Sequence, residues 1–150
     1  MGRKMDNSIV RGDEAADGRR QLVELREALQ QLHKTLLASE RMSYETSFGV
    51  TLSPYQFLQL LTNDPWFTWL APVTQLLADL DVRLDDKKSL TVADVQLLSR
   101  RAKLLLTPTE TGEGFSRQYD EVLQRDPDVL FGHVVMAKLL RAHSEKGIAE

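Results

Sequence analysis

Leucine recurs at alternating spacings of three and four residues in the first third of the chain, as Leu22, Leu25, Leu29, Leu32 and Leu36. This spacing places the leucines on one face of a helix, which we expect over residues 19–47. Gly49 is a suitable stop for that helix. Residues 1–18 mix both charges with glycine and hold little apolar material, so we expect a disordered N-terminal leader.

Two capping residues followed by proline predict the next helices. Ser53-Pro54 starts a short helix that ends near residue 63, and Asp64-Pro65 starts a longer one whose apolar face continues to residue 84. Pro72 lies inside this second pattern. Because proline removes a backbone donor and crowds the preceding turn, we expect it to kink the helix or to split it after Ala71. The polar residues 85–89 are expected to form a loop.

The last third of the chain predicts three more helices. Thr91 and Asp94 form a capping box for a helix that ends at Thr107-Pro108 and carries two apolar stripes, which indicates contacts on two sides. A short helical face follows, formed by Phe115, Tyr119, Val122 and Leu123. Asp126-Pro127 then starts a final helix that is apolar almost all round from Val129 to Leu140. Such a helix is either central to the core or partly a partner surface.

No segment shows a convincing strand alternation. The prediction is therefore an all-α protein, a compact helical bundle of four longer helices and two short ones. We expect a single domain over residues 19–144, with a frayed C-terminus over residues 145–150.

Composition excludes several kinds of chemistry. The 150 residues carry a net charge of −3, which gives no electrostatic reason to expect nucleic acid. The absence of cysteine excludes disulfides, thiolate metal sites and cysteine nucleophiles. No secretory signal and no apolar run of about 18 residues is visible, so we expect a soluble cytoplasmic protein that does not enter a membrane. The densest basic group, Arg100, Arg101 and Lys103, suits a helix C-terminus without any ligand.

The aromatic group Trp66, Phe67 and Trp69 is the most distinctive feature. It could anchor a protein partner or an apolar ligand, because large aromatic side chains supply contact area at low entropic cost. It could equally fill the core of the bundle. The apolar stripe that continues from it to Leu84 favours the core.

The histidines give no strong metal or cofactor signal. His33 and Glu40 share a helix face and could contribute to a metal site, but surface positions beside the leucine stripe explain them adequately. His133 and Met136 are both residue types that ligate haem iron, yet a histidine satisfied at a helix interface is the favoured interpretation. We therefore predict no catalytic residue, no metal and no cofactor, and keep His133 with the three aromatic residues as possible partner or ligand contacts.

Two resemblances bear on the family. Residues 119–128 resemble the junction between two tetratricopeptide repeats, but the other Asp-Pro, at Asp64-Pro65, does not lie at that family's period of about 34 residues. Residues 63–81 and 106–129 resemble stretches of a small, uncharacterised family of bacterial all-helical proteins. That resemblance implies a bacterial origin and a helical fold, and it carries no activity or site residues.

Two classes of function fit this sequence. The first is a non-enzymatic interaction protein, either a homo-oligomer or a helical adaptor, indicated by the doubly striped helix 92–106 and the apolar helix 128–142. The alternative is a bundle that binds a small apolar ligand or a metal between its helices, with Trp66, Trp69, His33 and His133 as candidates. An enzyme is not expected, because no acid–base constellation is visible.

Overall fold

Every regular element in the described part of the chain is a helix, which confirms the all-α prediction. The computed structural model describes residues 2–85 and 90–149, with side chains described for residues 16–85 and 90–145. The helices in these ranges are α1 (Gly2–Phe48), α2 (Pro54–Asn63), α3 (Pro65–Thr68), α4 (Ala71–Asp85), α5 (Val92–Leu105), α6 (Phe115–Arg125) and α7 (Pro127–Ala149).

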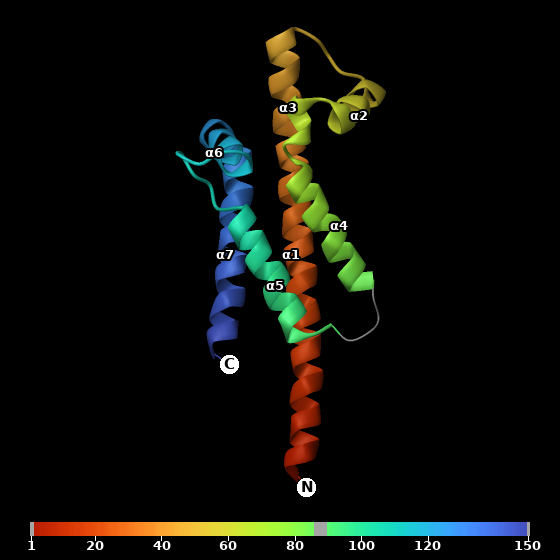
Figure 1. The fold of residues 1–150 in the computed structure, drawn as a ribbon, viewed down its shortest axis with the longest axis vertical. Coiled ribbons are helices and arrows are strands. Elements are labelled where there is room, and N and C mark those ends of the chain that lie inside the picture. Colours follow the sequence, from red (N-terminus) through yellow and green to blue (C-terminus); the bar gives the residue numbers. More distant parts are fainter. Residues whose placement is uncertain (1, 86–89, 150) are drawn as a thin grey trace.

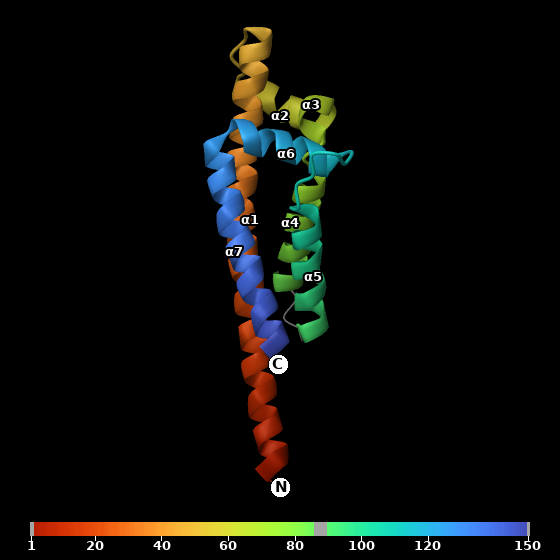
Figure 2. The same cartoon turned by 90° about the vertical axis from the view of Figure 1, so that its left-hand side faces the viewer.

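Helix α1 is the longest helix, and most of the other helices pack against it. Helices α4, α5 and α7 pack along it, and its contact with α7 is the most extensive (Figure 1). Helices α2 and α3 lie toward the C-terminal end of α1, whereas α6 runs across the bundle from the α5 side to the start of α7 (Figure 2). The fold is thus a bundle built around one long helix rather than a row of equal helices.

The leucine stripe of α1 is the centre of the core. Its five leucines are all buried, as the 3–4 spacing predicts. The other helices contribute the remaining members of the same apolar cluster, among them Leu70, Val73, Leu76, Leu80, Val95, Leu98, Tyr119, Val122, Val129 and Met136. Helix α7 packs tightly on α1 at Gly132, where a Cβ atom would lie 3.2 Å from Leu32 Cδ1.

The ends of the chain differ from the expectation. Helix α1 begins at Gly2 rather than near Arg19, and α7 continues to Ala149 rather than ending before residue 145. Residues 2–18 contain no proline, and extending an existing helix costs far less than starting one, so the packed part of α1 can propagate toward the N-terminus. This N-terminal part extends beyond all the other helices (Figures 1 and 2).

The helix divides before Ala71, at Trp69 and Leu70, and not after Ala71 as expected. Helix α3 ends at Thr68 and α4 begins at Ala71, so the single helix expected from Asp64-Pro65 is two, and the described ranges hold seven helices instead of six. Pro72 is the second residue of α4, where its missing N–H leaves no intrahelical bond unmade. The break changes the helical register, and Phe67 faces the core in place of Trp66.

The predicted N-cap at Ser53 and the predicted capping box at Thr91 are confirmed, and Ser53 also forms a capping box. Ser53 accepts from the backbone N–H of Gln56, Thr91 accepts from that of Asp94, and each partner side chain accepts in return. Gly49 follows α1 with φ of 63°, the left-handed conformation that ends many helices. Most of the polar loop expected at 85–89 lies outside the described residues.

Candidate interaction surface and interhelical cavity

Helix α7 buries one side and exposes another apolar side. Val129, Met136 and Leu140 are buried in the core. Four apolar side chains on the outer side are 41–71% exposed, and we call them the α7 stripe: Leu130, Phe131, Val134 and Val135. Their spacing of one and four residues makes them a continuous surface on one side of a helix. Helix α7 is therefore part of the core on one side and exposes an apolar surface on the other.

Two opposite charges flank the α7 stripe. Asp128 lies in the first turn of α7 and Lys138 lies one turn beyond Val135, and both side chains are exposed. Neither forms an ion pair with another side chain in the described part of the chain. The stripe is therefore an apolar centre with one unpaired acidic and one unpaired basic residue near its two ends.

Helix α5 has only one of its two predicted contacts. Its first stripe is buried through Val95, Leu98 and Ala102. Its second stripe, Leu97 and Leu104, is exposed, so the expectation of contacts on two sides is not met within the described residues. The two leucines are a smaller apolar surface than the α7 stripe, and they are a full two turns apart.

The aromatic group is divided between the core and the surface. Phe67 is fully buried, with its ring centroid 5.4 Å from that of Phe57. Trp66 is half-buried and meets Tyr44 and Phe48 at ring-centroid distances of 5.5 and 5.6 Å. These residues gather at the end of α1 beside α2 and α3. They form a packed aromatic cluster.

Trp69 is held by a buried carboxylate. Its Nε1 donates to Glu40 Oε2 at 3.4 Å, and its ring centroid lies 5.3 Å from that of Phe115. Glu40 is only 6% exposed and pairs through Oε1 with the Arg125 guanidinium. The interpretation of Glu40 as a surface residue is therefore wrong. A glutamate beside a leucine stripe becomes buried here because α6 brings a cation over it.

His33 is half-buried, and its hydrogen-bond partner differs from the partners of Glu40. Its Nε2 is 3.2 Å from Thr74 Oγ1 on α4. Burial lowers the pKa of His33 below its ordinary value, so the ring is neutral near pH 7. His33 is therefore partly covered and has a threonine hydroxyl as its partner, rather than lying freely on the surface as expected.

His133 is paired with a buried tyrosine. Its Nδ1 lies 2.8 Å from the hydroxyl oxygen of Tyr119, and the two rings meet edge to face at 5.4 Å. Burial raises the pKa of the Tyr119 phenol far above its ordinary value and lowers that of His133, so both groups are neutral near pH 7. His133 is thus satisfied at the α6–α7 junction, as the sequence favoured, although nothing in the sequence pointed to Tyr119 as its partner.

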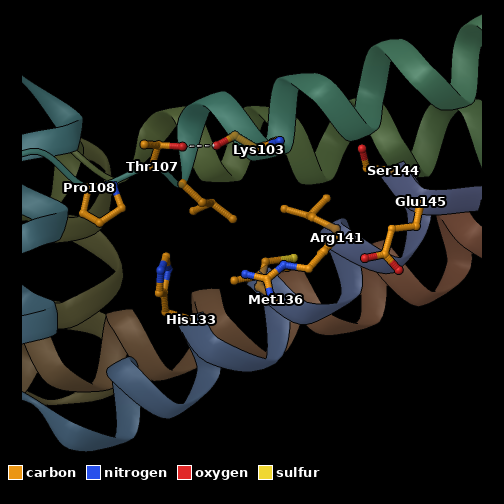
Figure 3. Close-up of a pocket in the computed structure, with 11 residues that line it drawn as sticks. Lys103, Thr107, Pro108, His133, Met136, Arg141, Ser144 and Glu145 are labelled. Atoms are coloured by element: carbon orange, nitrogen blue, oxygen red, sulfur yellow. Dashed lines mark hydrogen bonds between the residues drawn. The ribbon is translucent and has the colours of Figure 1, made fainter. Parts of the chain in front are cut away.

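A cavity of about 320 Å³ lies between the C-terminal half of α5 and α7. Its apolar lining comes mainly from Leu106, Met136 and Leu140, and Pro108 lies at one end. In Figure 3, His133, Met136 and Arg141 of α7 lie across the cavity from Lys103 of α5 and from Thr107, which follows that helix. Lys103 and Arg141 form no ion pair with any other described residue. The described residues that line it are Lys103, Leu106, Thr107, Pro108, His133, Met136, Ala137, Leu140, Arg141, Ser144 and Glu145.

The cavity and the α7 stripe have no residue in common. Met136 and Leu140 line the cavity, whereas Phe131 is exposed and Val135 lies at a shallow surface depression beside Glu24 and Glu27 of α1. Of the sequence candidates, only His133 reaches the cavity, and the two tryptophans do not. The cavity could not be found from the sequence, because its lining joins residues of α5 and α7 whose spacing along the chain follows no motif.

No metal site is formed within the described side chains, where no group of three or more histidine, aspartate or glutamate residues could hold an ion. Across those same residues, no helix has the length and apolar content needed to cross a membrane. Comparison of the chain with protein-family models, with curated proteins and with solved structures finds no match. The resemblance to a bacterial helical family therefore stays a prediction.

Proposed function

We propose that this protein is a non-enzymatic interaction protein that associates with a second copy of itself through α7. One observation carries the proposal: the α7 stripe, with Phe131 at its centre, leaves four neighbouring apolar side chains exposed. Contiguous apolar surface on a soluble domain is a mark of an interaction site, whereas scattered exposed apolar residues are normal.

Charge complementarity supports a second copy as the partner. In an antiparallel, two-fold symmetric pairing of α7, Phe131 lies opposite the partner subunit's Val135. The same register places Asp128 opposite the partner subunit's Lys138, and symmetry repeats both contacts. This pairing forms an apolar centre flanked by two ion pairs. The two charges that flank the α7 stripe, Asp128 and Lys138, each gain an opposite charge from the second copy.

The proposed interface is small. Four apolar side chains from each copy and two flanking ion pairs bury an area at the low end of the range for specific interfaces. We therefore expect the dimer to be weak and reversible. Sedimentation velocity over a concentration series tests it. The wild-type chain should show a concentration-dependent shift from monomer to dimer.

Phe131→Ser and Val135→Ser should each keep the chain monomeric at concentrations where the wild type dimerises. Val82→Ser is the matched control, because Val82 is also exposed but lies on α4. A wild-type monomer at all concentrations, or an equal effect of the α4 control, would count against the proposal.

A metal site between the helices is not supported, because the described side chains form no cluster of three or more possible ligands. The alternative of an apolar ligand at the tryptophans finds them packed against other aromatic residues or bound to Glu40. Neither arrangement is favoured by a specific observation over self-association.

A further inference from the structure

The cavity between α5 and α7 combines an apolar interior with two cations, Lys103 and Arg141, that form no ion pair within residues 16–85 and 90–145. Lys103 lies in the last turn of α5, and Arg141 lies five residues beyond Met136 along α7. The apolar lining lies between them, with Met136 fully buried and Leu106 and Leu140 nearly so. A volume of about 320 Å³ lies at the lower end of the range that small-molecule sites occupy.

The polar groups of the cavity can be assigned roles from their charges. Lys103 and Arg141 are the two cationic groups, and Arg141 offers a planar fork suited to two oxygens of one anion. His133 has its Nδ1 beside the Tyr119 hydroxyl, which leaves its Nε2 as the nitrogen without a described partner. Glu145 is the acidic residue among the described lining residues, and its negative charge repels an anion.

We propose that this cavity binds a small amphipathic anion, a molecule with one anionic head group and a short aliphatic chain. The head group lies between Lys103 and Arg141, and the aliphatic chain covers Leu106, Met136 and Leu140. The site is distinct from the α7 stripe, because no residue of the stripe lines the cavity.

Isothermal titration calorimetry of the full chain with octanoate tests the proposal. Octanoate should bind with a stoichiometry of one per chain. Across butanoate, hexanoate and octanoate, affinity should increase by up to about fourfold per methylene, the gain expected for burying one CH₂ group. Octylammonium has the same chain with the opposite charge and should bind at least tenfold more weakly than octanoate.

Charge variants test the head-group site. Arg141→Ala and Lys103→Ala should each weaken octanoate binding by roughly two- to fivefold, the effect of one partly exposed ion pair. Glu145→Gln should strengthen binding, because it removes the opposing charge. Lys34→Ala is the matched control, since Lys34 is an exposed lysine of α1 outside the cavity lining, and it should leave affinity unchanged.

Two further variants locate the site. Ala137→Phe adds volume at a lining residue that is itself exposed, so the chain should fold normally while octanoate binding is lost. Phe131→Ser, which interrupts the α7 stripe, should bind octanoate as the wild type does, so failure of the dimer proposal and failure of this one are distinguishable. Equal binding of octylammonium and octanoate, no dependence on chain length, or unchanged affinity in Ala137→Phe would overturn the proposal.

Discussion

Glu40 of α1 and Arg125 of α6 form an ion pair across 85 residues of sequence. The Glu40 side chain is nearly buried, whereas the Arg125 side chain is about half exposed. The second carboxylate oxygen of Glu40 accepts from Trp69 Nε1. One carboxylate therefore connects α1 to both α6 and the turn between α3 and α4.

Loss of Arg125 should destabilise the fold because it leaves a buried carboxylate without its cation. We expect Arg125→Met to lower the free energy of unfolding by about 1–3 kcal/mol, as measured by urea denaturation. The double variant Glu40→Met/Arg125→Met should cost less than the sum of the single variants, because no unpaired charge remains.

The matched control is Arg117→Met, which removes an exposed ion pair with Glu121 on the same helix. It should cost less than about 0.5 kcal/mol. Equal costs for Arg117→Met and Arg125→Met would show that the burial of Glu40 has no energetic consequence.

The Tyr119–His133 pair predicts one tautomer of the imidazole. The buried phenol is a donor that needs an acceptor, and His133 Nδ1 is the acceptor beside it at 2.8 Å. The imidazole proton should therefore lie on Nε2. Nitrogen chemical shifts of the histidine ring identify the tautomer, and a proton on Nδ1 would reverse the assigned direction of this hydrogen bond.

The same burial predicts a loss of stability in mild acid. The pKa of both His33 and His133 is lower in the folded chain than the ordinary 6.5, so the unfolded chain binds more protons as the pH falls below about 6.5. The contribution of these groups is complete above that pH and is lost as the pH falls through the folded pKa values. The urea midpoint should decrease between about pH 7.5 and about pH 5.5.

His133→Gln should make this pH dependence shallower, because one of the two titrating groups is removed. A double variant with His33→Gln should make it shallower still. A slope that is the same in the wild type and in both variants would contradict the assignment of the effect to these histidines.

Gly132 predicts a limit on side-chain size where α7 meets α1. A Cβ atom there would lie 3.2 Å from Leu32 Cδ1 and 3.9 Å from Leu32 Cα, so a larger side chain meets backbone as well as side chain. Gly132→Leu should lower the free energy of unfolding by about 1–3 kcal/mol, the usual cost of overpacking. Ala142→Leu is at an exposed position of the same helix and should change it by less than about 0.5 kcal/mol.

The N-terminal part of α1 should be the least stable part of that helix. Residues 2–15 extend past the other helices, so their backbone hydrogen bonds have no neighbouring helix to protect them (Figures 1 and 2). Amide hydrogen exchange should be fast there and slow from Leu22 to Leu36. Strong protection before residue 16 would show that this segment is stabilised by a contact with another copy or another protein.

The sequence predicted most of the fold because the fold depends on local signals. The leucine spacing of α1, the capping boxes at Ser53 and Thr91 and the stop at Gly49 are all encoded within a few residues. The division of α3 from α4 was expected in kind but not at its position, since proline can be accommodated in the first turn of a helix as well as end one. The helical state of residues 2–18 was not predicted, because composition alone does not show that a helix can extend from the packed segment that follows it.

The candidate sites were harder to predict because they depend on pairs of helices. Glu40 looked like a surface residue until α6 placed Arg125 over it. The cavity joins Lys103 to Arg141, and no periodicity within α5 or α7 indicates which residues will face one another. Helix α7 was recognised as apolar on all sides, but only the packed structure shows which side remains exposed.

The charges at the two ends of the α7 stripe provide the most direct test of self-association. Asp128→Lys and Lys138→Asp each place like charges opposite one another twice in the proposed antiparallel dimer. Each variant alone should therefore be monomeric at concentrations where the wild type dimerises. Asp128→Lys also changes the first turn of α7, so its fold is checked first by circular dichroism.

An equimolar mixture of the two variants restores both ion pairs in a mixed dimer. Sedimentation velocity of that mixture should show a dimer that neither variant forms alone. If the mixture stays monomeric while the wild type dimerises, or if both single variants dimerise as the wild type does, antiparallel pairing of α7 is contradicted.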